Sequence, residues 1–223
     1  MKKTFFQLLL VVLAVSSCAT TRFYAGFTPE TAIHDMVLMG PTSYQYYLDR
    51  DKQESFSDSL SAVSEAMIAD LVDILGVPVS GRIELNDDQK EEAAAYMRYL
   101  AAQKPKQRGE FRIPDILDQA LEAEGHRYGL LLFAQGMTRD SKGYAKEVTK
   151  SAAIAVATAV LSLGTMTMYP TVDHYVSQVF AAVLDAETDQ LVFYNLTKPE
   201  EEHPLNPVIV RDELRAALKD FLK

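Results

Sequence analysis

The chain of 223 residues contains one cysteine, Cys18. It cannot form an internal disulfide, so its stability must come from packing. Lysine and arginine number 22 against 31 aspartate and glutamate, a formal net charge of −9. Because phosphate backbones are held by clustered basic side chains, this balance excludes nucleic acid as a partner. Long apolar runs are also scarce: residues 5–15 are too few to span a bilayer, which needs about 20.

Motifs of catalysis are missing as well. There is no Gly-rich phosphate loop after a strand and no Gly-x-Ser-x-Gly elbow. The histidines lie far apart and without metal-ligand spacing, at His34, His126, His174 and His203. His174 beside Asp173, and His203 beside the acidic run 200–202, could meet as a carboxylate–imidazole site, but exposed loop positions are the simpler interpretation. The sequence therefore predicts no catalytic residue, no cofactor and no metal.

The first residues have the order of features found in export signals. Lys2 and Lys3 make a basic start, residues 5–15 are almost wholly apolar, and small residues lead to Cys18. A cationic head, a short apolar segment and small residues before a cleavage point are what export and processing require. Residues 1–17 are therefore predicted to be a signal peptide.

Val15, Ser16, Ser17 and Cys18 resemble a lipobox, the motif of bacterial lipoproteins, with Val where Leu is commonest. The resemblance implies that Cys18 is diacylated on sulfur, that the peptide before it is removed and that its new amino group is acylated. Each buried methylene contributes about 0.8 kcal/mol, so several acyl chains hold a protein at a membrane. Ala19 stands where Asp would suggest inner-membrane retention, which favours the outer membrane, with the domain facing the periplasm. The alternative is a chance cysteine after an ordinary secretory signal.

Cleavage would remove Lys2 and Lys3 and change the formal charge from −9 to −11. Residues 18–35 show no periodicity and contain Thr, Gly and Pro, which predicts a tether between the lipid and the folded body. Residues 36–223 have the length of one domain with its own core.

Two segments near the start of this domain have clear patterns. Apolar and aromatic residues in 36–48, interrupted by Gly40-Pro41, predict a strand or a broken pair of strands. Residues 55–75 predict a helix capped by Ser55 and ended by Gly76. Its apolar side chains recur three or four apart and should form one buried stripe, made of Phe56, Leu60, Val63, Met67, Leu71 and Ile74.

The remaining elements follow from periodicity and from capping residues. They are a short strand at 77–85, a helix opened by a capping box at 86–89, a polar loop at 104–109, a helix from about Pro114 to Gly125, a buried strand at 128–134, strands at 171–184 and 191–195 joined by a polar turn, and a helix at 206–222. The predicted fold class is α/β (α+β): a single mixed sheet with helices packed on it, and a C-terminal β-hairpin followed by a helix.

Residues 148–168 differ from the rest, because small and apolar residues continue there without a charge after Lys150. A small-residue helix packed within the domain or an oligomer is one interpretation. A segment that contacts the membrane is another, since the length suffices although Ala, Thr and Ser make the hydrophobicity weak. A flexible insertion is the third.

Two further features could bind ligands. Tyr44, Tyr46 and Tyr47 could form a stacking platform for sugars or peptide, although aromatic residues at strand spacing more often pack in a core or at an edge. The acidic run 200–202 could hold a cation, although an exposed loop explains it more simply.

Three pieces of the chain resemble a group of bacterial accessory lipoproteins, which includes curli-secretion-channel proteins, penicillin-binding-protein activators and the amino-terminal domain of the Tol-system propeller protein. The pieces are a helix ending at Leu75-Gly76, the helix, glycine and strand of 121–134, and the hairpin of 179–194. The hairpin is similar to the group's strand, Asp-x-x-Thr-Gly, strand pattern, with Asp189 in place of Gly. The resemblance implies a domain without enzymatic activity that binds partner proteins or assembles into a ring.

The first functional hypothesis is therefore a non-enzymatic lipoprotein, anchored at Cys18, whose domain binds a protein partner in the envelope or forms a homo-oligomer. The second is an oligomeric secretion or transport component in which residues 148–168 contact the bilayer. The third is a hydrolase of envelope polymers.

Overall fold

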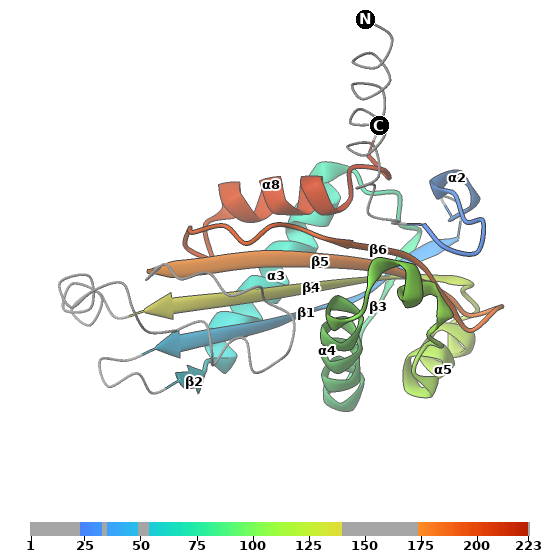
Figure 1. The fold of residues 1–223 in the computed structure, drawn as a ribbon, viewed down its shortest axis with the longest axis horizontal. Coiled ribbons are helices and arrows are strands. Elements are labelled where there is room, and N and C mark those ends of the chain that lie inside the picture. Colours follow the sequence, from blue (N-terminus) through green and yellow to red (C-terminus); the bar gives the residue numbers. More distant parts are fainter. Residues whose placement is uncertain (1–22, 33–34, 49–53, 140–173, 223) are drawn as a thin grey trace, which may run out of the picture.

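A mixed sheet of six strands forms the centre of the protein (Figure 1). The structure is a computed structural model that describes residues 23–32, 35–48, 54–139 and 174–222. The strands are β1 (Met36–Leu48), β2 (Glu54–Phe56), β3 (Gly81–Ile83), β4 (Tyr128–Arg139), β5 (Tyr175–Asp185) and β6 (Gln190–Leu196). The strand order is β2-β1-β4-β5-β6, and β3 also pairs with β1. The predicted α/β class with a single mixed sheet is confirmed.

Strand directions follow from the connections between the strands. β1 runs parallel to β3 and β4, whereas β2 is antiparallel to β1 and the chain β4-β5-β6 is antiparallel throughout. β1 is one strand with a shift of register between Met39 and Thr42. The shift falls at Gly40-Pro41, where proline has no N–H to donate to a neighbour.

Helices cover both faces of the sheet (Figure 1). One face carries α3 (Asp58–Leu75) and α8 (Pro207–Ala217), and the other carries α4 (Asp87–Ala102), the 3-10 turn η1 (Pro105–Glu110) and α5 (Asp115–Ala123). A short helix, α2 (Pro29–Ala32), precedes β1. β4 is buried along nearly its whole length, as its uninterrupted apolar run predicted. None of the described helices combines the length and the hydropathy needed to cross a bilayer.

The predicted helix ends are confirmed in several places. Asn86 and Gln89 form a reciprocal capping box at the start of α4. Gly76 and Gly125 have φ of 65° and 72°, the left-handed conformation that ends a helix. Asp189 has φ of 53° in the β5–β6 turn, so it takes the conformation for which glycine is common, and aspartate tolerates it.

The prediction for α3 was wrong about which face is buried. Ser57, and not Ser55, caps the helix, because residues 54–56 pair with β1 as β2. The buried side chains of α3 are Ser61, Ser64, Ile68, Leu71 and Val72. Of the predicted stripe only Leu71 is fully buried, and Phe56, Val63 and Ile74 are exposed.

Hydrogen bonds to β1 explain why serines lie inside. Between its contacts with β3 and β2, the outer edge of β1 has backbone amides that no strand pairs. Ser61 Oγ accepts from Gln45 N at 3.0 Å, and Glu65 Oε1 accepts from Ser43 N at 3.1 Å. Because unpaired amides at a covered edge are costly, α3 turns its polar side chains toward them.

Three smaller differences concern the length of elements. The strand expected at 77–85 is limited to β3, and the polar loop expected at 104–109 contains η1. Residues 18–35 were expected to be a tether, but residues 23–32 belong to the folded body. Tyr24 N donates to Val192 O at 2.9 Å, and Tyr24 and Phe27 are buried.

Candidate functional site: the outer face of α3 and a buried carboxyl

Two of the predicted features lie outside the described residues. They are the lipidation site Cys18, with the preceding residues of its motif, and the small-residue segment 148–168. The lipid anchor and the membrane contact of 148–168 therefore remain predictions.

The three tyrosines of β1 do not form one platform. Tyr44 lies 5.2 Å from the ring of Phe56 and 5.8 Å from that of Phe133, and Arg98 stands over its face at 5.0 Å. Tyr46 contacts Phe56 at 6.1 Å. Tyr47 follows Tyr46 in the strand, so it points to the opposite face. The tyrosines thus pack at the β1–β2 edge, which was the simpler of the two interpretations.

The histidines come together differently from the prediction. The rings of His174 and His203 contact Tyr175, at centroid distances of 4.1 and 4.7 Å. Asp173 lies outside the described residues, so a pair with His174 stays a prediction. Within the described ranges, no three His, Cys, Asp or Glu side chains are placed to hold a metal ion.

One histidine contact was not foreseen. His126 Nδ1 lies 3.2 Å from Asp35 Oδ1, and the other oxygen of Asp35 accepts from Arg127 N at 3.1 Å. These bonds join the residue before β1 to the residues before β4, which start side by side in parallel. Only the parallel pairing of two strands that are distant in sequence could have revealed this contact.

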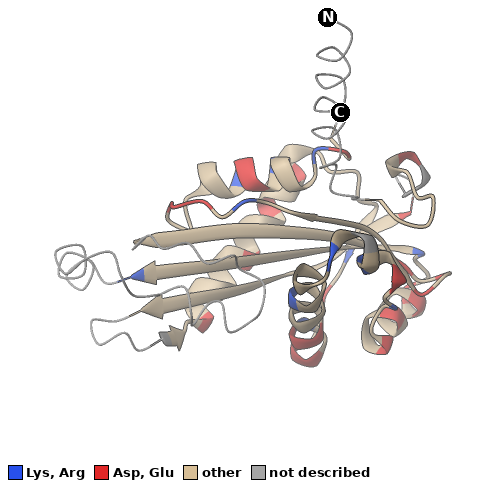
Figure 2. Ribbon diagram, in the orientation of Figure 1, with Lys and Arg blue, Asp and Glu red and all other residues tan. Residues whose placement is uncertain are grey.

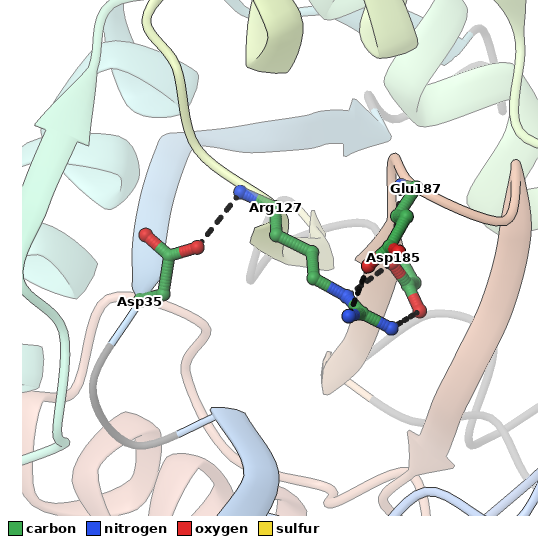
Figure 3. A network of polar contacts seen from close by, with 4 residues as sticks. All are labelled: Asp35, Arg127, Asp185 and Glu187. Carbon is green, nitrogen blue, oxygen red and sulfur yellow. Dashed lines mark hydrogen bonds and ion pairs between the residues drawn. The ribbon is translucent and has the colours of Figure 1, made fainter.

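Arg127 continues this network to the β5–β6 turn (Figure 3). Its guanidinium makes two bonds of 2.9 Å to the buried carboxylate of Asp185 and also contacts Glu187. The hydrogen bond to Asp185 raises the pKa of Arg127. A bidentate pair of this kind fixes geometry, so we interpret the network as a clamp that holds the hairpin turn to the start of β4.

Acidic residues gather on α4 and α5 (Figure 2). Asp87 and Asp88 lie in the first turn of α4, and Asp115 and Asp118 in that of α5, where the helix dipole favours them. Burial, aided by neighbouring anions such as Asp189, raises the pKa of Asp118. This surface repels other anions and lies on the face of the sheet opposite α3.

The outer side of α3 carries large apolar side chains instead. Leu60, Val63, Met67 and Ile74, which we call the α3 stripe, recur at helical spacing. Leu60 and Met67 are half-buried, and Met67 packs against the core. Val63 is 55% exposed and Ile74 is 72% exposed, and the turns between them extend over about 16 Å. Single exposed apolar residues are ordinary, whereas apolar side chains that recur on one side of a helix can mark a contact surface. The sequence pattern that predicted a buried stripe had found these residues and misjudged only what they contact.

The inner sides of α3 and α8 enclose a polar row across the sheet. Gln45, Gly136 and Ser177 stand side by side on β1, β4 and β5. Ser177 Oγ donates to Oε2 of Glu213 at 2.7 Å, and this glutamate of α8 is only 4% exposed. Burial raises the pKa of Glu213 to about 7, with Glu200 adding to the rise and the Ser177 bond opposing it. No local pattern marked Glu213 as buried, because a glutamate in an amphipathic helix is normally exposed.

Comparison with known proteins finds distant likeness in structure alone. No protein-family profile and no curated protein matches the chain. A PelC dodecamer from Paraburkholderia phytofirmans superposes with a TM-score of 0.40 at 9% identity, over 91% of this chain and 94% of that one. The C-terminal domain of LpoB from Salmonella enterica superposes with a TM-score of 0.32 at 7% identity, over 80% and 87%. At these scores the chain has a distant structural similarity to PelC and LpoB, and no residue is carried over.

Proposed function

We propose that this protein is a non-enzymatic lipoprotein of the cell envelope, held in the outer membrane by lipid on Cys18, whose α/β domain binds another protein through the α3 stripe. In this proposal residues 1–17 are the removed signal peptide, and the folded body faces the periplasm. The observation that carries the binding role is the exposure of Val63 and Ile74 on one side of a helix whose other side packs on the sheet.

The energetics favour a protein as the ligand of this surface. Complete burial of a Val, Leu, Ile or Met side chain is worth about 1.5–3 kcal/mol, so covering side chains that are half exposed or more gains about 1–2 kcal/mol each. Two charged residues, Asp70 and Asp73, are among the exposed side chains between Val63 and Ile74, and Asp73 is paired with Arg82. A flat apolar row along a helix suits another helix or a sheet face better than a small polar molecule.

The geometry disfavours the hydrolase hypothesis. The described residues contain a close hydroxyl–carboxyl pair, Ser177 and Glu213, but both side chains are buried beneath α8. A polymer chain has no access to a serine in this position.

Photo-cross-linking in cells tests the proposal with the full chain. A photoreactive amino acid is placed at position 63 or 74, and the matched control carries it at Val208, an apolar residue that is 51% exposed on α8. We expect defined cross-linked products from positions 63 and 74 and weak or diffuse ones from 208. A product of twice the chain mass identifies self-assembly, and a product of another mass identifies a partner. Equal cross-linking from all three positions, or none from 63 and 74, would contradict the proposed surface.

A further inference from the structure

Glu213 has few partners for a buried carboxyl group. Ser177 donates to Oε2, whereas Oε1 has no hydrogen-bond partner among the described residues. An ionised carboxylate in such a place costs several kcal/mol unless a cation or several donors compensate it. Burial of the neutral acid costs much less free energy, and the neutral acid has a proton that it can donate to a hydrogen bond.

The element beside Glu213 adds to the penalty. Residues 197–206 connect β6 to α8, and Glu200 in this segment pairs with Ser177 through two backbone bonds of 2.9 Å. The negative charge of Glu200 disfavours ionisation of Glu213. His203, from the same segment, has its ring on Tyr175 and accepts from Leu205 N through Nδ1 at 3.1 Å.

The charged groups of the neighbouring helices are engaged elsewhere. On α3, Glu65 binds Lys90 at 2.7 Å. On α8 itself, Arg211 and Arg215 contact Asp212 at 3.3 and 3.8 Å on the exposed side of the helix. In the part of the chain that the structure describes, no cation forms an ion pair with Glu213.

The two ends of α8 are held in different ways. The C-terminal half is fixed by the core, where Leu214 and Leu218 are fully buried, and by Asn195 Nδ2, which donates to Ala217 O at 2.8 Å. The segment before α8 is tied to β5 at its start by Thr197, whose backbone N–H donates to Val179 O at 3.0 Å and whose Oγ1 accepts from Val179 N at 3.0 Å. From Glu200 onward it lies along the polar row: Glu200 is paired with Ser177, and Pro204 packs against Gly136 so closely that a Cβ at 136 would lie 2.3 Å from it. A charge on Glu213 therefore acts on the segment more than on the rest of the helix.

We propose that Glu213 is a proton-controlled latch, which when neutral holds residues 200–206 against the polar row and when ionised releases them. The inference does not depend on the lipid anchor or on the α3 stripe. Its pH range follows from the pKa of Glu213, about 7 in the closed structure against 4.5 for an ordinary glutamate. Between these values the closed form binds the proton that the open form has lost, so the opening equilibrium rises tenfold per pH unit and levels off above pH 7.

Hydrogen exchange of the full chain, followed by mass spectrometry, tests the latch. The peptides to follow contain the mutually bonded amides of Ser177 and Glu200, and a peptide from the middle of β4 is the internal control. After correction for intrinsic exchange, protection at the two amides should fall by about fortyfold from pH 5 to pH 7, with little change in β4. Glu213→Gln, which keeps the shape and cannot ionise, should remove the fall.

A second variant keeps the test decisive if Glu213→Gln does not fold. Glu200 is exposed, so Glu200→Gln should fold normally. Glu200→Gln removes the neighbouring negative charge and should lower the pKa of Glu213. The fall in amide protection should then level off at a lower pH than in the wild type. Protection that is independent of pH in the wild type, or a fall of equal size in Glu213→Gln, would overturn the latch.

Discussion

Two isoleucines of α3 give a direct test of how this helix is oriented. Ile68 is fully buried against the sheet, whereas Ile74 is 72% exposed six residues later in the same helix. The substitutions Ile68→Ala and Ile74→Ala remove the same atoms from the same element. Any difference in their effects on the free energy of unfolding therefore reports burial, because the change in helix propensity is shared.

The expected magnitudes are well separated. At position 68 the loss of three carbon groups at about 0.8 kcal/mol each, together with the cavity left behind, should cost about 3 kcal/mol. For a chain of this length that lowers the Tm by about 6–12 °C. At position 74 the change should stay within about 0.5 kcal/mol.

Urea unfolding followed by far-UV circular dichroism measures both variants, since the chain has no tryptophan for fluorescence. The slope of the transition should be the same in both, so that the midpoints compare stability directly. If Ile74→Ala is as destabilising as Ile68→Ala, the stripe is packed inside the protein, and the argument for an exposed binding face fails.

Three further substitutions, with Gly81→Ala as a control, test the buried polar contacts. Because the pKa of Glu213 is raised to about 7 from 4.5, the native state retains a proton that the unfolded state releases. This group alone should lower the unfolding free energy by about 3 kcal/mol as pH rises from 4.5 to 7. Urea titrations across this pH range should show the loss in the wild type and not in Glu213→Gln. Gly136→Ala places a Cβ 2.1 Å from a side-chain oxygen and should cost about 1–3 kcal/mol, whereas Gly81→Ala, whose Cβ meets its nearest atom at 3.8 Å, should unfold at nearly the wild-type urea concentration. Arg127→Met leaves the buried carboxylate of Asp185 without its cation and should lower stability by about 2–3 kcal/mol; a Tm equal to that of the wild type would show that the clamp contributes nothing.

Local patterns in the sequence predicted most of the fold. The uninterrupted apolar run of β4 indicated a central strand, and the capping box at Asn86 and the glycine at 76 fixed helix ends that the structure reproduces. These features depend on residues within one turn or one strand, so they can be recognised from the sequence alone. β2 was missed because so short a segment forms a strand only by pairing with the edge of β1.

The functional features depended on contacts between distant segments. Ser61 and Ser64 look like exposed residues of an amphipathic helix, and only their contacts with Gln45 of β1 show why they turn inward: Ser61 accepts from its backbone amide and Ser64 from its side-chain amide. Their inward position leaves Val63 and Ile74 outside. Glu213 was missed for a similar reason, because its burial depends on β5 and on the segment before α8. Hydrophobic spacing thus locates a helix more reliably than it identifies the face that is buried.

Attachment of lipid to Cys18 is the claim on which the proposed place of this protein in the cell rests. Growth with a labelled fatty acid, followed by purification and intact-mass measurement of the full-length gene product, tests it most directly. We expect a labelled chain that begins at Cys18 and fractionates with the outer membrane, and a Cys18→Ser variant without label. An unlabelled wild-type chain that still carries residues 1–17 would contradict it.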